Sequence, residues 1–266
     1  MTEASYQIQS QKQKDYYNQT AKHYDQWHVD TGSAAVVDAW NFSNLKKFLG
    51  KNKIDTCLDI ACGTGRLSNN LLQIAREVYG VDQSQAVLDI AQAKYPQLKL
   101  ACAEVVDLPY ADNFFDLVLI NGSLHHFFAV KKTLTEAKRV LKPGGYFVLL
   151  GEPSSLYHKI YNPFFYIWLV DRAINKIFSL VKKSPASSEI EPEAEAYHPP
   201  QLKQQFLDSG FIVRQFYTYD FFPRHESRIC LKIYRWYLPY EHKILAKICP
   251  FLGSAIQIFA QKPKNA

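Results

Sequence analysis

One segment indicates the architecture more clearly than any other: Leu58-Asp59-Ile60-Ala61-Cys62-Gly63-Thr64-Gly65. Its first residues complete an apolar run that predicts a buried strand, and a helix is predicted to begin directly after it. The glycines at 63 and 65 permit a tight turn and let the backbone approach a ligand closely. The free N–H groups of the following helix would then point into the same crevice as the turn.

Asp82 adds a second feature at the end of the next predicted strand. A carboxylate at that place can accept hydrogen bonds from both hydroxyls of a ribose. Together, the turn and the acid favour a site for a nucleoside-containing ligand. A dinucleotide such as NAD(P) remains an alternative. Its motif needs a third small residue, and Ser68 at that position departs from the motif without excluding it.

Strands and helices alternate on both sides of this turn. Short apolar runs are followed by segments with helical spacing of apolar residues, and Ser84 is suited to cap one of the helices. Near-continuous apolar strands are typical of a parallel sheet that is covered on both faces. We therefore predict a Rossmann-like α/β fold, doubly wound around a mostly parallel seven-stranded sheet. The predicted strands are 56–60, 78–81, 98–103, 115–120, 146–150, 211–219 and 255–260, and the predicted helices between them are 67–75, 85–94, 133–141 and 201–208.

The remaining segments are predicted to surround this sheet. Residues 1–14 are polar and are expected to fray, whereas aromatic residues at helical spacing predict a short helix over 16–27 that acts as a lid. A second helix is predicted over 34–48. The predicted organisation is an N-terminal lid and cofactor-binding core over 1–152, a helical cap insert over 153–200, and the rest of the core sheet over 201–266 with a second insert at about 221–252.

The composition fits a globular protein of 266 residues with a net charge of +6, 47% hydrophobic residues and five cysteines. No pair of cysteines has CxxC spacing, so we expect reduced thiols in a cytoplasmic protein. The polar start after Met1 indicates no signal peptide, and no apolar run reaches the roughly 18 residues of a membrane span. The positive charges form no block typical of nucleic-acid tails, so we expect no nucleic-acid partner. The oligomeric state is left open.

Further motifs follow the glycine turn, and the set resembles class I methyltransferases that depend on S-adenosylmethionine (SAM). The similarity points to the small-molecule branch related to the ubiquinone and menaquinone methyltransferases. It covers about residues 16–152 and, more weakly, the helix and strand around Gly210. The motifs are Asp59–Gly65, Val81-Asp82-Gln83-Ser84, Glu104–Tyr110 with Asp112–Asp116, Ser123-Leu124-His125-His126-Phe127, and Arg139–Gly145.

The resemblance implies a set of contacts to SAM as cofactor. Ala61 stands where the family often has Gly, which is a common and harmless change. Glu104 stands where the family more often has Asp, so the adenine contact is expected to shift. The implied contacts are Asp59, Ala61, Cys62, Gly63 and Gly65 at the methionine end, Asp82 at the ribose, Gln83, Glu104 and Val105 at the adenine, Asn121 on the sulfonium side, and Tyr24 closing over the cofactor from the N-terminal helix.

His125 and His126 follow the fourth predicted strand, where a catalytic base on the substrate side would sit. A histidine there can take a proton from a hydroxyl or an acidic carbon of an acceptor. The alternative is that one ring packs and the other orients a loop. Methyl transfer displaces a good leaving group from a sulfonium, so positioning alone can supply much of the rate and a base is optional. Glu152 is expected to shape the pocket rim, and no metal site is predicted.

The two inserts carry apolar and aromatic residues that the sheet does not need. The unbroken apolar run Phe164–Val170 favours a cap over an acceptor pocket, with plain core packing and contact with a membrane surface as alternatives. The second insert combines basic and aromatic side chains, which suit anionic lipid headgroups, an acidic substrate or a solvated helix face. They include Arg224, Arg228, Lys232, Arg235, Lys243, Lys247, Tyr234, Trp236, Tyr237 and Tyr240.

The sequence therefore predicts an enzyme that moves a methyl group from SAM to an O, N or C atom of a small hydrophobic acceptor, such as a quinone, isoprenoid, polyketide or lipid-like molecule. One alternative is a regulatory protein that binds SAM without transferring the methyl group, although nothing in the glycine turn is broken. Another is an NAD-dependent oxidoreductase. A nucleic-acid methyltransferase is disfavoured, because Ile120-Asn121-Gly122-Ser123 stands where an Asn-Pro-Pro-Tyr-type motif would be expected.

Overall fold

The computed structural model describes residues 3–25, 32–156, 196–221 and 228–265, and its centre is a seven-stranded sheet. The strands are β1 (Ile54–Ile60), β2 (Ala75–Asp82), β3 (Lys99–Cys102), β4 (Phe115–Asn121), β5 (Leu141–Pro153), β6 (Ile212–Tyr219) and β7 (Ala255–Gln261). Their order across the sheet is β3-β2-β1-β4-β5-β7-β6. Strands β1 to β5 run parallel, and β7 lies antiparallel between β5 and β6. The predicted Rossmann-like, mostly parallel seven-stranded sheet is confirmed.

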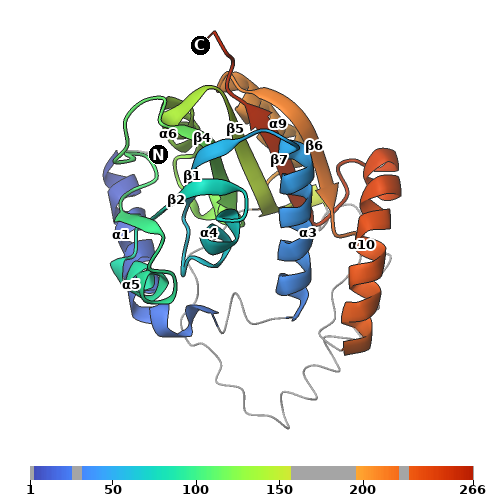
Figure 1. Cartoon of the computed structure of the whole chain (residues 1–266), viewed down its shortest axis with the longest axis horizontal. Helices are drawn as coiled ribbons and strands as arrows, with labels where there is room; N and C mark the ends of the chain where they lie inside the picture. The colour runs from blue at the N-terminus through green and yellow to red at the C-terminus, as the bar shows by residue number, and fades with distance from the viewer. Residues whose placement is uncertain (1–2, 26–31, 157–195, 222–227, 266) are drawn as a thin grey trace.

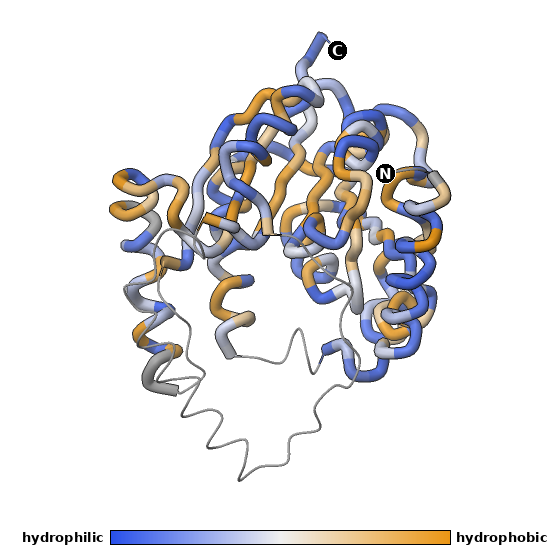
Figure 2. The backbone as a smooth tube through the Cα atoms, turned by 180° about the vertical axis from the view of Figure 1, so that it is seen from behind, coloured by the Kyte–Doolittle hydropathy of each residue, from blue (hydrophilic) through white to orange (hydrophobic). Residues whose placement is uncertain are grey.

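Helices cover both faces of this sheet (Figure 1). They are α1 (Glu3–Thr20), α3 (Gly32–Leu49), α4 (Arg66–Leu71), α5 (Gln85–Lys94), α6 (Val130–Val140), α9 (Pro199–Asp208) and α10 (Arg228–Ile248), with short 3-10 turns η1 (Ala21–His23) and η2 (Leu124–His126). In β4, Leu117 and Leu119 pack in one core cluster with α3, α4 and α10, whereas Val118 and Ile120 pack in a second cluster with α6 and α9. Burial on both faces explains the near-continuous apolar strands, which Figure 2 shows as apolar colouring in the centre.

The structure contradicts the expectation that residues 1–14 fray for residues 3–14, the part of that segment that it describes. Helix α1 already begins at Glu3 and ends at Thr20, so the helix predicted over 16–27 starts too late. The cause is tertiary packing, because Tyr6, Ser10 and Gln13 are buried against the rest of the protein. Two of these three side chains are polar, so apolar periodicity does not reveal the helix. The second predicted helix is confirmed as α3, with slightly wider bounds.

The helix predicted over 67–75 is also too long. Helix α4 ends at Leu71 and β2 begins at Ala75, because Ala75 pairs with Ile54 in the parallel ladder. By contrast, α5 has its predicted bounds, and the Ser84 hydroxyl accepts the Val87 N–H as an N-cap.

The two inserts differ in how much of them the structure describes. The cap predicted over 153–200 falls mostly on residues 157–195, which lie outside the described residues, so its helical structure stays a prediction. The second insert, predicted at about 221–252, contains α10.

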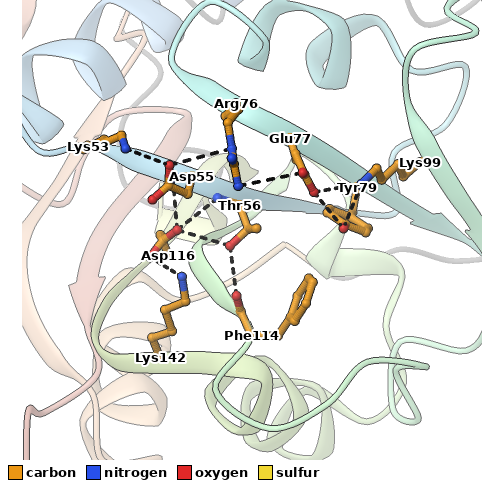
Figure 3. A network of polar contacts seen from close by, with 10 residues as sticks. All are labelled: Lys53, Asp55, Thr56, Arg76, Glu77, Tyr79, Lys99, Phe114, Asp116 and Lys142. Carbon is orange, nitrogen blue, oxygen red and sulfur yellow. Dashed lines mark hydrogen bonds and ion pairs between the residues drawn. The ribbon is translucent and has the colours of Figure 1, made fainter.

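Polar side chains tie neighbouring strands together at the edge where β1 and β4 begin (Figure 3). Asp116 Oδ2 accepts the backbone N–H groups of Asp55 at 3.0 Å and Thr56 at 2.9 Å. Lys142 Nζ donates to Asp116 Oδ1 at 2.7 Å. Partial burial by itself raises the pKa of Asp116, but these donors outweigh it and hold the pKa below its ordinary value. The ionised Asp116 thereby fixes β1, β4 and β5 at this end of the sheet.

Candidate functional site

A cavity of about 400 Å³ opens at the carboxyl ends of β1, β2, β4 and β5. Its walls come from α1, the first half of α3, the strand ends and the segment 121–129 after β4. Both its size and its position are typical of small-molecule sites in sheets of this kind. Of the residues predicted to bind the cofactor, those that line the cavity are Tyr24, Ala61, Asp82, Gln83, Glu104, Val105 and Asn121.

The turn after β1 has the left-handed backbone that its glycines permit. Ala61, Gly63 and Gly65 have φ of 56°, 54° and 79°. A Cβ on Gly63 would lie 2.8 Å from the Tyr24 hydroxyl, so the tyrosine closes directly over this turn. A Cβ on Gly65 would instead meet side chains of α5 and the segment 95–98 at 3.1–3.2 Å. Gly63 therefore allows close approach from the Tyr24 side, and Gly65 allows the turn to pack on the core.

Asp82 lines the cavity, and each of its two carboxylate oxygens accepts a hydrogen bond from a backbone N–H group. Its Oδ2 accepts the Gly63 N–H at 3.0 Å, and its Oδ1 accepts the Ser84 N–H at 3.0 Å. Burial raises the pKa of Asp82, and these N–H groups oppose the rise by stabilising the charged form. A carboxylate has about four acceptor positions, so two oxygens that each accept one N–H keep capacity for further donors. The geometry suits a ligand with two adjacent hydroxyl groups.

Helix α1 lies along the same rim of the cavity, and three of its side chains contact two polar side chains there. The Ser10 hydroxyl donates to Glu104 Oε1 at 2.8 Å, and the Tyr6 hydroxyl donates to Glu104 Oε2 at 3.1 Å. Gln83 Nε2 donates to Gln13 Oε1 at 3.0 Å. The predicted lid therefore reaches the site through α1, with contacts near its N-terminus that the sequence interpretation placed in a frayed segment.

Asp59 and Cys62 lie in or beside the turn but do not line the cavity. Asp59 is buried and accepts the Ser68 hydroxyl at 2.6 Å. Burial raises the pKa of Asp59 to about 7, with a further rise from the charge of Asp82 and an opposing effect of Ser68. The Cys62 thiol is buried as well, and burial raises its pKa. Asp59 can therefore act on a cavity ligand only through its ionised form, which burial disfavours, while Cys62 remains a protonated thiol.

The two candidate catalytic histidines have different environments. His126 lines the cavity, where its ring lies edge-on to Tyr17 with the centroids 6.2 Å apart. His125 does not line it, and its Nδ1 lies 2.9 Å from Glu152 Oε2. The two imidazole rings lie 4.0 Å apart, centroid to centroid. The geometry therefore gives His126 access to a ligand and gives His125 a supporting position behind it.

Glu152 organises the turn that carries both histidines. Its fully buried carboxylate accepts the backbone N–H groups of Ser123 and Leu124 at 2.9 Å and of His125 at 3.1 Å, in addition to the His125 ring. Sequence reasoning gave Glu152 only a place at the pocket rim. The available signal is an acid at the end of an otherwise apolar strand, because a buried carboxylate needs several donors.

Sequence reasoning missed the wall opposite the α1 rim, because its residues belong to no motif. From α3, Val37, Asp38 and Asn41 line the cavity, and Tyr219 lines it from the end of β6. Asp38 forms an ion pair with Arg66, the first residue of α4. Segments far apart in the sequence meet here because α3 packs on the face of the sheet at β6, where the rings of Trp40 and Tyr219 lie 4.6 Å apart, centroid to centroid. Only the fold therefore reveals these residues.

Comparisons with known proteins agree with this geometry. Residues 58–149 match the family model described as a methyltransferase domain. The chain is 30% identical over 231 residues to a demethylmenaquinone methyltransferase of Symbiobacterium thermophilum, covering 78% of this chain and 89% of that protein. It is 31% identical over 215 residues to the ubiquinone/menaquinone biosynthesis C-methyltransferase UbiE of Neisseria meningitidis, covering 75% of this chain and 83% of that protein.

Solved structures share the fold at lower identity. Phosphoethanolamine N-methyltransferase 1 of Haemonchus contortus, solved with phosphoethanolamine and S-adenosylhomocysteine, superposes with a TM-score of 0.62 at 16% identity. The match covers 99% of this chain and 50% of that one. At this identity the likeness concerns the fold alone, and the two sequence relatives carry the family assignment.

Proposed function

This chain belongs to the class I SAM-dependent methyltransferases, and on this premise we propose that it methylates a small hydrophobic acceptor with a hydroxylated aromatic ring. The observation that supports the proposal most is one cavity lined by both polar and aromatic residues. Its lining includes the acids Asp82 and Glu104 together with Tyr17, His126 and Phe127. A polar cofactor can bind to the former and a largely apolar acceptor to the latter.

The polar residues of the cavity fit SAM. We assign the ribose hydroxyls to Asp82, whose carboxylate keeps acceptor capacity after binding two backbone N–H groups. The adenine is assigned to Gln83, Glu104 and Val105, and the methionine end to the turn at Ala61 and Gly63. When bound, SAM supplies a methyl group on a sulfonium with a good leaving group. The task of the protein is then to orient the two ligands and exclude water.

The acceptor is proposed to be a quinol-like ring, because the relatives are named as quinone methyltransferases and one of them as a C-methyltransferase. We assign its ring to the space beside Asn121, near Tyr17 and Phe127, which line the cavity. Aromatic side chains favour an aromatic ligand through edge-to-face and stacked contacts.

His126 is proposed to take the proton of the ring hydroxyl. Loss of that proton raises the electron density of the ring, which strengthens its nucleophilic carbon or oxygen. His125 and Glu152 act as positioning residues. If Glu152 accepts the Nδ1 proton of His125, it fixes the tautomer of that ring, which in turn packs against His126. Base catalysis by His126 would supply only part of the rate, because holding SAM and the acceptor in the reactive orientation also lowers the barrier.

A binding experiment separates this function from the dinucleotide alternative. Titration calorimetry with S-adenosylhomocysteine and with NADH should give saturable binding of the first and none of the second. Replacing Asp82 by Ala should weaken binding of S-adenosylhomocysteine. Tighter binding of NADH would contradict the assignment of the cavity to SAM.

A further inference from the structure

Helix α10 presents an apolar strip to solvent. Ile233, Trp236, Tyr240, Ile244 and Ile248 follow one another at intervals of three or four residues, so they share one helix face. All five are exposed, Trp236 to 69% and Ile248 to 70%. Most of the large apolar side chains exposed in the described part of the chain lie in this helix or just after it. Single exposed apolar residues are ordinary on a protein surface, but a continuous strip marks an interaction site.

The opposite face of α10 is anchored to the protein. Tyr234 and Leu238 are buried in the core cluster that also contains residues of α3, and the Tyr234 hydroxyl donates to Asp220 Oδ1 at 2.9 Å. Glu241 is buried too and accepts the Phe221 N–H. The helix is therefore held in place by one face, and its apolar strip takes no part in the core that the described residues form.

The exposed charges of this helix are all cationic among its described side chains. Lys232, Arg235 and Lys247 are exposed, whereas the acid Glu241 is buried. Trp and Tyr side chains favour the boundary between lipid headgroups and acyl chains, and the strip contains Trp236 and Tyr240, whose rings lie 5.3 Å apart. An amphipathic helix with aromatic and aliphatic residues on one side and cations beside them is typical of helices that lie in the surface of a membrane.

We propose that the exposed strip of α10, with its neighbouring cations, binds the surface of an anionic lipid bilayer. The charge of the helix selects this occupant, because anionic headgroups complement Lys232 and Arg235 while the acyl region accepts the apolar strip. No helix in the described part of the chain is long and apolar enough to cross a membrane.

The position of α10 gives this contact a consequence for the cavity. Helix α10 packs against α3, and Val37 and Asp38 of α3 line the cavity. Figure 1 shows the two helices side by side, both extending beyond the sheet, with α1 at the opposite edge of the molecule. A chain docked through α10 therefore holds its cavity close to the bilayer. The link between docking and the cavity rests on the proposed function, because only a hydrophobic acceptor needs to enter the cavity from lipid. The docking of α10 on the bilayer does not rest on the proposed function.

The experiment is flotation of the full chain with vesicles of phosphatidylcholine alone and of phosphatidylcholine mixed with phosphatidylglycerol. We expect binding to the anionic vesicles and little to the neutral ones. Two cations near an anionic leaflet change partitioning by roughly tenfold or more, so Lys232→Gln with Arg235→Gln should lower it by that factor. Trp236→Ser with Ile244→Ser should abolish it. The matched control is Ile8→Ser on α1, where Ile8 is 58% exposed and Ile244 is 56% exposed.

The other occupants of this face give different results. Failure of the wild-type chain to float with anionic vesicles would overturn the proposal, as would equal flotation of the Trp236 and Ile244 variant. A dimer by light scattering that Ile244→Ser dissociates, with no flotation, would assign the face to a second copy. A large drop in melting temperature for the strip variants, with no flotation of the wild type, would assign it to residues 157–195 of the same chain. Binding of S-adenosylhomocysteine, measured on each variant, is independent of these outcomes and reports on the proposed function alone.

Discussion

The backbone N–H of Gly63 donates to Oδ2 of Asp82 at 3.0 Å, which joins the turn after β1 to the acid at the end of β2. The turn therefore sets the direction of the carboxylate, and the carboxylate stabilises the left-handed turn. Because Asp82 lines the cavity and Gly63 lies directly under Tyr24, one hydrogen bond couples the carboxylate that we assign to the ribose to the tyrosine that closes over the turn. The two sequence motifs form a single structural unit.

The first prediction concerns Asp82→Ala. Two hydroxyl hydrogen bonds to a charged acceptor are lost, each worth about 1.5–3 kcal/mol and together about 3–6 kcal/mol, so affinity for S-adenosylhomocysteine should fall by roughly a hundredfold to ten-thousandfold. Calorimetry measures this change. Asp89→Ala is the control, because Asp89 is an exposed acid on α5. The affinity of this variant for S-adenosylhomocysteine should equal that of the wild type. Unchanged affinity of Asp82→Ala would remove this residue from the site.

The second prediction concerns the contact between α1 and Glu104, which we assign to the adenine. Ser10 and Tyr6 donate to Glu104, so they orient its carboxylate and hold α1 closed over the cavity. The double variant Ser10→Ala with Tyr6→Phe should weaken S-adenosylhomocysteine binding by roughly tenfold, since hydrogen bonds to a charged group are lost. Cleavage within α1 by a protease should also become faster in the complex. Tighter binding would mean instead that the two hydroxyls compete with the adenine for Glu104.

The third prediction is that ligand binding releases protons. The ordinary pKa of Asp59 is 3.8, and burial raises it to about 7, so Asp59 is largely protonated at pH 6. The ammonium group of the bound methionine moiety favours the ionised carboxylate, so binding at pH 6 should release up to about one proton. Affinity should rise with pH toward 7 and then level off. Calorimetry in buffers of different ionisation enthalpy measures the release, and Asp59→Asn should abolish it.

The same raised pKa has a consequence for stability with the opposite sign. Asp59 binds its proton more tightly in the folded than in the unfolded chain, so its contribution is present below pH 3.8 and is lost as pH rises toward 7. Without ligand, the wild-type chain should therefore lose stability relative to Asp59→Asn over this interval. A difference in melting temperature that does not change with pH would contradict the raised pKa.

The fourth prediction concerns the opposite end of the sheet, at Asp116. Replacing it by Ala removes the acceptor of Asp55 N–H, Thr56 N–H and Lys142, and the free energy of unfolding should fall by about 2–4 kcal/mol. Because its folded pKa is lowered, this contribution is complete above the ordinary value of 3.8 and is lost as pH falls further. Denaturant unfolding tests both statements. Asp112→Ala, which breaks only a surface pair with Arg139, should cost less than about 1 kcal/mol.

The sequence predicts the fold well where burial and local chemistry agree. Strands β1 and β4 are apolar on both faces because helices cover both, and a parallel sheet leaves this pattern in the sequence. Helix α5 begins where Ser84 can cap it. Helix α1 does not follow such a rule, because Ser10 and Gln13 face a polar rim and are buried without being apolar. A helix that packs on a site rather than on a core leaves no apolar stripe to find.

Some residues of the site can likewise be named from the sequence, and others cannot. Residues tied to strand ends, such as Asp82 and Glu104, can be named from the sequence because the ladder of a parallel sheet brings strand ends together. Asn41 and Tyr219 cannot, because only the packing of α3 beside β6 brings them into one cavity. Glu152 illustrates a third case, in which the residue is conspicuous in the sequence but its function depends on four donors from another segment.

The central claim is the transfer of a methyl group from SAM to a hydrophobic ring, and mass spectrometry of the acceptor tests it most directly. The purified chain is incubated with SAM and a panel of quinols and other hydroxylated apolar aromatics. The account predicts one product heavier by a single methylene group, formed together with an equal amount of S-adenosylhomocysteine and lost in Asp82→Ala. Tight binding of S-adenosylhomocysteine with no mass change in any acceptor of the panel would contradict the account and favour a SAM-binding protein without transferase activity.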